Sequence, residues 1–164
     1  MGAWVTAARV RVATGAVSQI RLSGYAEPSQ PITAWDSGRP AWSAVERAIQ
    51  VAGLVDVFLW YQGESDALAG PDAITRYRDR LVDLMRRVRL ASANPSLLVV
   101  VCGLADYSEA ETAYAALRAQ QMAAVQSDPR ARYLSTQGLP HDGQHLTVAG
   151  YQGLAVRLAE MLRH

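Results

Sequence analysis

Two continuously apolar segments limit the folds open to this chain more than any other feature. Residues 55–61 and 97–102 combine β-branched, aliphatic and aromatic side chains, and only Asp56 interrupts them. A strand with one face in water alternates apolar and polar residues, whereas a strand buried on both faces loses that alternation. Both segments are therefore predicted to be strands that are covered on both sides.

Helical patterns separate these strands along the chain. Apolar side chains recur at three and four residues from Pro71 to about Leu90, and Pro71 suits the first turn of a helix. We also expect helices over 2–14, 41–52, 109–126 and from Thr147 to the end, and shorter strands over 17–22 and 133–135. Alternating strands and helices predict an α/β fold with a parallel sheet, here as one domain over 1–164.

Composition argues against two classes of partner. The net charge is +1, and the sixteen basic residues, all arginine, are scattered rather than gathered on one stretch. A nucleic-acid-binding protein usually concentrates its positive charge, so no nucleic acid is expected. No apolar stretch is long enough to cross a bilayer, so no membrane is expected either. The single cysteine, Cys102, ends an apolar strand and is predicted to be a core residue.

Three loops are the places to look for chemistry. In parallel sheets ligands bind beyond the carboxyl ends of the strands, which singles out residues 24–40, 62–70 and 137–146. The second loop contains an amide, two carboxylates and a hydroxyl within Gln62–Asp66. The third places Asp142 three residues before His145 and just ahead of a helix. A carboxylate at that spacing can orient an imidazole as a general base.

These residues resemble a known family. The run Trp-Tyr-Gln-Gly-Glu-Ser-Asp at 60–66, followed by Asp-x-x-His-Leu-Thr at 142–147, is similar to the SGNH (GDSL-like) hydrolases. The nearest branch is that of the sialate O-acetylesterases and acetylxylan esterases. Ile32-x-x-Trp35 and Leu117-Arg118-x-Gln120-Gln121 resemble the same branch, and the likeness runs over roughly residues 20–160.

The resemblance implies a three-layer α/β/α flavodoxin-like fold and the hydrolysis of acetyl esters on sugars, without a metal or cofactor. His145 would be the base and Asp142 its orienting acid. Gln62 and Gly63 would belong to the block that shapes the oxyanion hole, and Glu64 would fix that loop. One preorganised donor to a developing oxyanion is worth about 3–4 kcal/mol.

The sequence departs from the family pattern in two places. The family's nucleophilic serine follows its first strand in a Gly-Asp-Ser or Gly-Gln-Ser-Asn motif, and no such motif occurs here. The chain is therefore expected to lack that first strand. The family also has a glycine pair near the position of Ile32, where this chain has Glu27–Pro31. The two prolines in that stretch remove backbone donors and stiffen the loop.

Two other interpretations of the same residues stay open. Gly63-x-Ser65-x-Ala67 follows a strand and is comparable with the Gly-x-Ser-x-Gly nucleophile elbow, although a helix would have to begin almost at Ser65. His141, Asp142 and His145 could suggest a metal site. Three ligands within five residues suit catalytic zinc poorly, so no metal is expected.

Two functions follow from these observations. The first is a carbohydrate esterase whose nucleophile comes from upstream residues or from a partner chain that completes the sheet. A sheet without its first strand exposes unpaired backbone, which favours such pairing. The second is an inactive module that binds glycans or serves as a structural subunit of a larger assembly. A nucleotide-binding domain is disfavoured because no glycine-rich phosphate loop follows a strand.

Overall fold

The computed structural model describes residues 22–163. The predicted helix over 2–14 and all but the last residue of the predicted strand over 17–22 lie outside the described residues. The elements are η1 (Ile32–Trp35), α2 (Pro40–Ala52), β1 (Val57–Trp60), α3 (Glu64–Leu68), α4 (Pro71–Ala91), β2 (Leu98–Cys102), η2 (Ser108–Ala110), α5 (Glu111–Gln126), β3 (Ala131–Leu134) and α6 (Val148–Met161).

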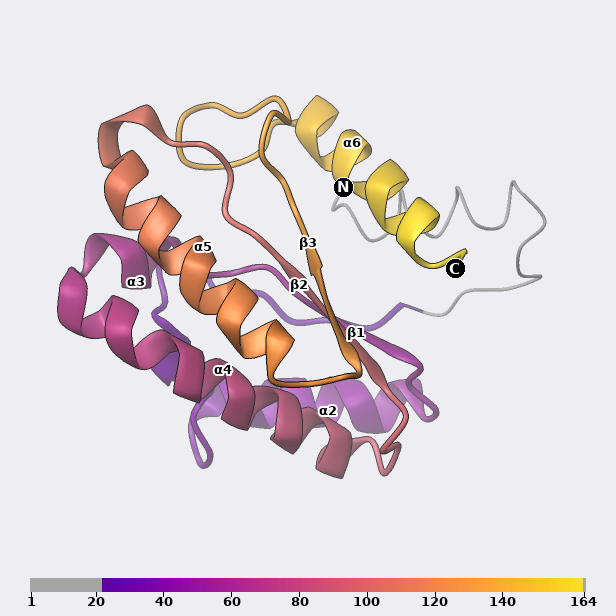
Figure 1. The fold of residues 1–164 in the computed structure, drawn as a ribbon. Helices are drawn as coiled ribbons and strands as arrows, with labels where there is room; N and C mark the ends of the chain where they lie inside the picture. The colour runs from indigo at the N-terminus through magenta and orange to yellow at the C-terminus, as the bar shows by residue number, and fades with distance from the viewer. Residues whose placement is uncertain (1–21, 164) are drawn as a thin grey trace.

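The sheet is parallel throughout, as the alternation of strands and helices predicts. Its order is β1-β2-β3, with Val57 beside Leu98 and Val99 beside Ala131. Figure 1 shows α4 and α5 on one side of the sheet and α6 on the other. The crossovers α4 and α5 cover the same face. The chain therefore has the expected α/β architecture with helices on both faces of a parallel sheet.

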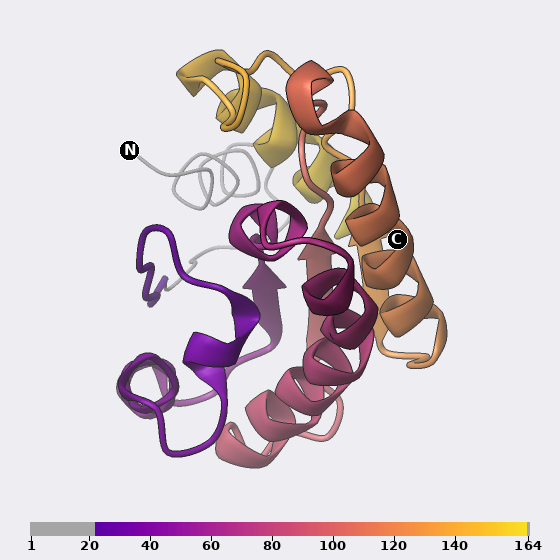
Figure 2. The same ribbon diagram turned by 90° about the vertical axis from the view of Figure 1, so that its left-hand side faces the viewer.

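Each strand of the sheet contributes to two apolar clusters, one on each face. Val99 and Val101 of β2 point into the cluster shared with α4 and α5, and Val100 and Cys102 point into the cluster beneath α6. All four side chains are almost fully excluded from solvent, Cys102 included. This two-sided burial is the physical reason for the continuous apolar pattern. Figure 2 looks onto the face that carries α4.

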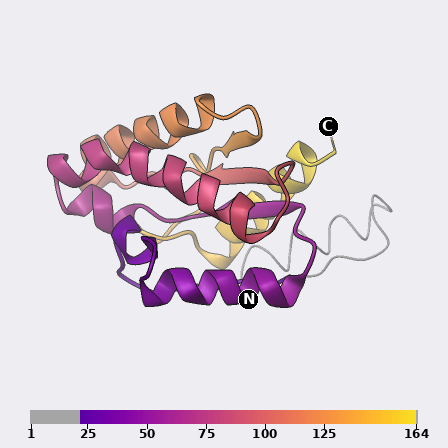
Figure 3. The ribbon, with the colours of Figure 1, turned by 90° about the horizontal axis from the view of Figure 1, so that it is seen from below.

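The helices largely match their predicted patterns. Pro71 begins α4 directly after Gly70, and the apolar stripe of that helix is buried from Ile74 to Val88. Thr147 caps α6, since its hydroxyl accepts a hydrogen bond from the Gly150 backbone. Figure 3 shows α2 on the side of β1 and α5 on the side of β3. None of the described helices is long and apolar enough to cross a membrane.

Three local predictions need correction. Loop 62–70 was predicted to be irregular but contains the short helix α3. Glu64 and Asp66 lie in its first turn, where acidic side chains interact favourably with the helix N-terminus and stabilise it. Loop 24–40 contains η1. The last strand begins at Ala131, two residues before the predicted start at Tyr133, because the exposed Arg132 interrupts the apolar pattern expected of a strand.

The outer edge of β1 differs from the rest of the sheet. Among the described residues β1 pairs only with β2. The residues Val57 to Leu59 are half-buried, whereas Val99 to Val101 on the neighbouring strand are fully buried. Within the described part of the chain, this edge therefore has backbone groups that a further strand could pair with.

Candidate active site

A buried tyrosine on α4 fixes the backbone at the end of β1. The Tyr77 hydroxyl accepts a hydrogen bond from the Trp60 indole at 3.0 Å and donates to the Gln62 carbonyl at 2.7 Å. The Gln121 side chain on α5 donates to the same carbonyl at 3.1 Å. Tyr77 and Gln121 have no exposed surface. The backbone of residues 60–62 is thus anchored to two helices that come later in the chain.

The Gln62 side chain joins two of the three predicted loops. Its amide nitrogen donates to the Gln30 carbonyl at 3.0 Å and to the Asp66 carboxylate at 2.6 Å. The same carboxylate oxygen accepts a hydrogen bond from the Ile32 backbone at 2.9 Å. Both amide hydrogens of Gln62 therefore have protein acceptors, so its contacts act on the shape of the loop. Burial raises the pKa of Asp66, and its hydrogen bonds with Gln62 and Ile32 oppose that effect.

Gly63 occupies a position that only glycine suits. Its φ of +148° is rarely adopted by other residues, and a Cβ atom there would overlap the Leu117 side chain of α5. The Gly63 backbone N–H donates to the Glu64 carboxylate at 3.0 Å. The Gln-Gly-Glu run therefore packs directly on the helix that carries Leu117 and Gln121.

Glu64 is half-buried and lies among tyrosines. Burial raises the pKa of the Glu64 carboxyl, whereas nearby backbone N–H groups and the charge of His145 lower it. Burial is also the main reason why the pKa values of Tyr61 and Tyr151 are raised, and the charge of Glu64 adds to it. The Tyr61 hydroxyl is buried and has no hydrogen-bond partner among the described residues. It is therefore a buried donor without a partner in the described part of the chain, and it lies within the field of the Glu64 charge.

The loop before α6 forms a closed turn on the surface. The Asp142 N–H donates to the His145 carbonyl at 2.9 Å, and the His145 N–H donates to the Asp142 carboxylate at 3.0 Å. The base of the turn is closed by a hydrogen bond from the Thr147 N–H to the Pro140 carbonyl at 3.0 Å. Asp142 and His145 are both exposed. The recorded bond of the Asp142 carboxylate is thus to the His145 backbone.

Electrostatics link this turn to the loop after β1. The charge of His145 acts on Glu64, and the charges of Glu64 and Asp142 both act on the Tyr151 hydroxyl. Burial raises the pKa of the Tyr114 hydroxyl to about 12, and the charge of Glu64 adds to this effect. Segments about 80 residues apart in sequence therefore lie near enough for their charges to interact, as expected for loops at the carboxyl end of a parallel sheet.

The structure bears differently on the two alternative interpretations. A helix does begin at Glu64, as a nucleophile elbow requires, but Ser65 lies inside α3 and lacks the positive φ of a strained turn. The His141 ring accepts a hydrogen bond from the Gly143 N–H at 3.2 Å. Over residues 22–163 no group of three His, Cys, Asp or Glu side chains is arranged to hold a metal ion.

Three residues that support the site were given no role from sequence. Asp66 stands inside the recognised run, yet nothing local indicates that it reaches Ile32. Tyr77 falls within the apolar stripe of α4 and therefore looks like an ordinary core residue. Gln121 lies in the resembling stretch on α5, but only the packing of α5 brings it to Gln62.

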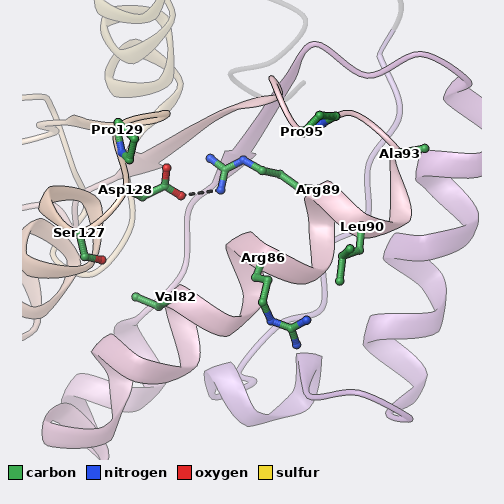
Figure 4. Close-up of a pocket in the computed structure, with 9 residues that line it drawn as sticks. All are labelled: Val82, Arg86, Arg89, Leu90, Ala93, Pro95, Ser127, Asp128 and Pro129. Atoms are coloured by element: carbon green, nitrogen blue, oxygen red, sulfur yellow. Dashed lines mark hydrogen bonds and ion pairs between the residues drawn. The ribbon is translucent and has the colours of Figure 1, made fainter.

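A cavity of about 480 Å³ lies away from these residues, near the amino ends of β2 and β3. Arg89 in its wall is paired with Asp128 and also donates to the Leu97 and Arg130 carbonyls. Figure 4 shows this pair between α4 and the turn before β3. Because the charges of this pair neutralise each other, the pair provides no free catalytic group. The residues that line the cavity are Val82, Arg86, Arg89, Leu90, Ala93, Pro95, Ser127, Asp128 and Pro129.

Solved structures share this fold. A carbohydrate acetylesterase from Xanthomonas citri superposes with a TM-score of 0.75 at 21% identity, over 99% of this chain and 40% of that one. A protein from Arabidopsis thaliana gives a TM-score of 0.70 at 24% identity, over 80% and 56%. A mutant acetyl esterase with a bound acetate ion gives a TM-score of 0.70 at 15% identity, over 99% of this chain and 90% of that one. This chain therefore spans only about half the length of the first two.

The search of curated proteins found no match. The profile of one family, described as carbohydrate esterase, sialic acid-specific acetylesterase, matches residues 5–164. That match covers nearly the whole chain and confirms the resemblance seen in the Gln-Gly-Glu and Asp-x-x-His motifs, while the neighbouring structures confirm the predicted fold class. The chain belongs to the sialic acid-specific acetylesterase family of carbohydrate esterases.

Proposed function

We propose that this chain forms the base and oxyanion half of an enzyme that removes acetyl groups from sugars. His145 is the general base, Asp142 orients it, and the Gln62–Glu64 loop shapes the oxyanion side. The observation that carries the proposal is that both motifs lie on separate loops beyond the carboxyl ends of the strands in an acetylesterase-family fold, with the charge of His145 among the causes that lower the pKa of Glu64. The substrate class is an acetylated sugar or glycan.

The nucleophile in this proposal is a serine from outside the described residues. It comes from upstream residues or from a partner chain that adds a strand beside β1, whose outer edge is unpaired among the described residues. The half-buried side chains of Val57 to Leu59 support this placement, because a further parallel strand would cover them. Tyr61 directly follows β1, and its buried hydroxyl has no hydrogen-bond partner among the described residues.

The reaction then follows the usual two steps of serine ester hydrolysis. The imidazole of His145 takes the serine proton as the serine oxygen attacks the acetyl carbonyl carbon. The same proton goes to the sugar oxygen as that bond breaks, which leaves an acetyl-serine. A water molecule, deprotonated by His145, attacks the acetyl carbonyl, and acetate leaves as the serine regains its proton.

Hydrolysis of p-nitrophenyl acetate and of glucose pentaacetate tests the proposal. Three samples would be assayed: the chain alone, the chain extended by any residues encoded upstream of Met1, and the chain mixed with any neighbouring gene product that carries a Gly-Asp-Ser or Gly-Gln-Ser motif. We expect turnover only in a form that supplies the serine, and its loss in His145→Ala. The absence of turnover in every form would count against the esterase.

Two variants decide which carboxylate orients His145. Among the described residues the Asp142 carboxylate accepts a hydrogen bond from the His145 backbone, while the charge of His145 lowers the pKa of Glu64, a second carboxylate. We expect Asp142→Asn to lower kcat by about 10⁴, the cost of losing the orienting acid in a serine triad. If Glu64→Gln lowered kcat by the same factor while Asp142→Asn stayed active, Glu64 rather than Asp142 would be the carboxylate that orients His145.

The second function is an inactive glycan-binding or structural module. One observation favours it: Ser65, the only serine in the recognised motif, is held in helical backbone rather than at a strained turn. Binding of acetylated glycans without release of acetate would support this module. Loss of turnover in Ser65→Ala would instead identify Ser65 as the nucleophile and contradict both an inactive module and an external serine.

A further inference from the structure

The loop after β2 holds the loop that carries His145. Asp106 lies four residues beyond β2, and its carboxylate accepts hydrogen bonds from the Gly138 N–H at 2.8 Å and from the Gln137 side chain at 3.2 Å. Gly138 has a φ of +74°, so the chain turns at the residue that Asp106 binds. Figure 1 shows the segment between β2 and α5 beside the segment between β3 and α6.

The two loops stay paired beyond the ends of their strands. The Gly103 N–H donates to the Leu134 carbonyl at 2.9 Å, and the buried Thr136 hydroxyl donates to the Gly103 carbonyl at 2.7 Å. Asp106 provides the next connection outward, at the point where the backbone pairing stops. It therefore lies at the junction between the rigid sheet and the exposed turn.

Charge strengthens this connection. The Gly138 N–H is the main cause that lowers the pKa of Asp106, and Gln137, Arg118 and His141 lower it further. Arg118 is itself fixed, because it donates to the Ala105 carbonyl and pairs with Glu111. A carboxylate that stays ionised makes charge-assisted hydrogen bonds, which are about twice as strong as neutral ones.

Beyond Gly138 the turn makes few hydrogen bonds to the rest of the sheet. Leu139 and Leu146 are buried beneath it, and the Thr147 bond to Pro140 closes it within its own segment. The bonds that His141 and Asp142 make also stay inside the turn. The apolar contacts hold the turn against α6. Directional hydrogen bonds from other elements reach the start of the loop from the Asp106 carboxylate, at Gln137 and Gly138, and from the Arg157 side chain of α6, which donates to the Ser135 and Gln137 carbonyls.

We propose that Asp106 is a positioning residue that holds the start of the 137–147 loop and so fixes the position of His145. Its importance for catalysis rests on the proposed function, because it acts through His145 and does not itself touch the substrate. The anchoring of the loop is a property of the fold and can be measured without any activity. A displacement of about 1 Å at a catalytic group can cost a factor of about 100 in rate.

Hydrogen–deuterium exchange tests the anchoring directly. The variants are Asp106→Ala, Asp106→Asn and the control Glu109→Ala, whose carboxylate on the same loop bonds to the exposed Tyr107 hydroxyl. In Asp106→Ala we expect exchange over residues 138–147 to rise at least about tenfold, with α5 unchanged. Asparagine offers an acceptor to Gly138 and, after an amide flip, a donor to Gln137, so it should stay within about threefold.

Kinetics test the consequence in a form that turns over p-nitrophenyl acetate. We expect Asp106→Ala to lower kcat by a factor of about 10–100 with KM within twofold, and Asp106→Asn to restore most of it. Unchanged exchange and kcat in Asp106→Ala would overturn the proposal, as would equally faster exchange over the whole chain. If no form hydrolyses esters while the local exchange effect holds, the anchoring stands and the proposed esterase fails.

Discussion

The two loops of the candidate site are held in opposite ways. The loop after β1 is part of the core: Gln62 and Asp66 are 9% and 2% exposed, and each binds a segment far away in sequence. The turn with Asp142 and His145 lies in solvent and bonds mainly to itself. Changes to Gln62 or Asp66 should therefore cost stability, whereas changes to the side chains of Asp142 or His145 should cost activity alone.

The largest expected effect is on the exposed side. In an active form of the enzyme, His145→Ala should lower kcat/KM by a factor of about 10⁶, or about 8 kcal/mol. The melting temperature should stay within about 1 °C, because an exposed side chain with no core contact is removed. Ester hydrolysis and calorimetry on the same sample measure both. A drop of several degrees would mean that His145 also supports the fold.

The next effect lies on the buried side. Gly63→Ala should destabilise the fold by about 3 kcal/mol, because it combines an unfavourable φ with overlap against Leu117. For a chain of this size that lowers Tm by about 6–12 °C. Gly143→Ala is the matched control: its φ is +115°, but a Cβ there would only touch Tyr107 at 3.7 Å. We expect it to cost about 1 kcal/mol from backbone strain. Equal losses in the two variants would contradict the comparison.

Tyr77→Phe isolates the hydrogen bonds of the buried loop. The variant keeps the ring but leaves the Trp60 indole without its acceptor and removes a donor from the Gln62 carbonyl. We expect a loss of about 2 kcal/mol in urea-induced unfolding. Tyr107→Phe removes a hydroxyl that bonds only to exposed Glu109 and should stay within about 0.5 kcal/mol. A neutral Tyr77→Phe would show that the loop does not depend on this anchor.

The smallest effect has the opposite sign and depends on pH. The pKa of Glu64 is raised by burial, so the folded state disfavours the charged form. This penalty is absent below the pKa of the unfolded state and complete above the folded pKa. Glu64→Gln should therefore raise Tm by about 2–4 °C at pH 8 and by less than about 1 °C at pH 4.

Asp142→Asn serves as the control for the pH effect. Its side chain is exposed, so Tm should be the same as in the wild type at both pH values. Thermal melts at the two pH values give the comparison directly. A stabilisation by Glu64→Gln that is equal at pH 4 and pH 8 would mean that charge burial is not its cause.

The most regular parts of the fold were predictable because their signals are local. The stripe from Ile74 to Val88 specifies a helix with one buried face, and the run 97–102 specifies a strand buried on both sides. Helix α3 was missed because five residues are too short for a periodic pattern. The start of β3 was missed because Arg132 interrupts its apolar run.

Residue types and their spacing were enough to predict the parallel α/β class, the family, and the two motifs in which the candidate residues lie. These are properties of residue type and spacing, which need no knowledge of distant contacts. Only the tertiary structure decided that Asp66 reaches Ile32, that Leu117 leaves no room for a side chain at Gly63, and that Asp106 holds the His145 loop. Each of these contacts joins residues more than thirty positions apart, and such pairs form only once the sheet and helices have packed.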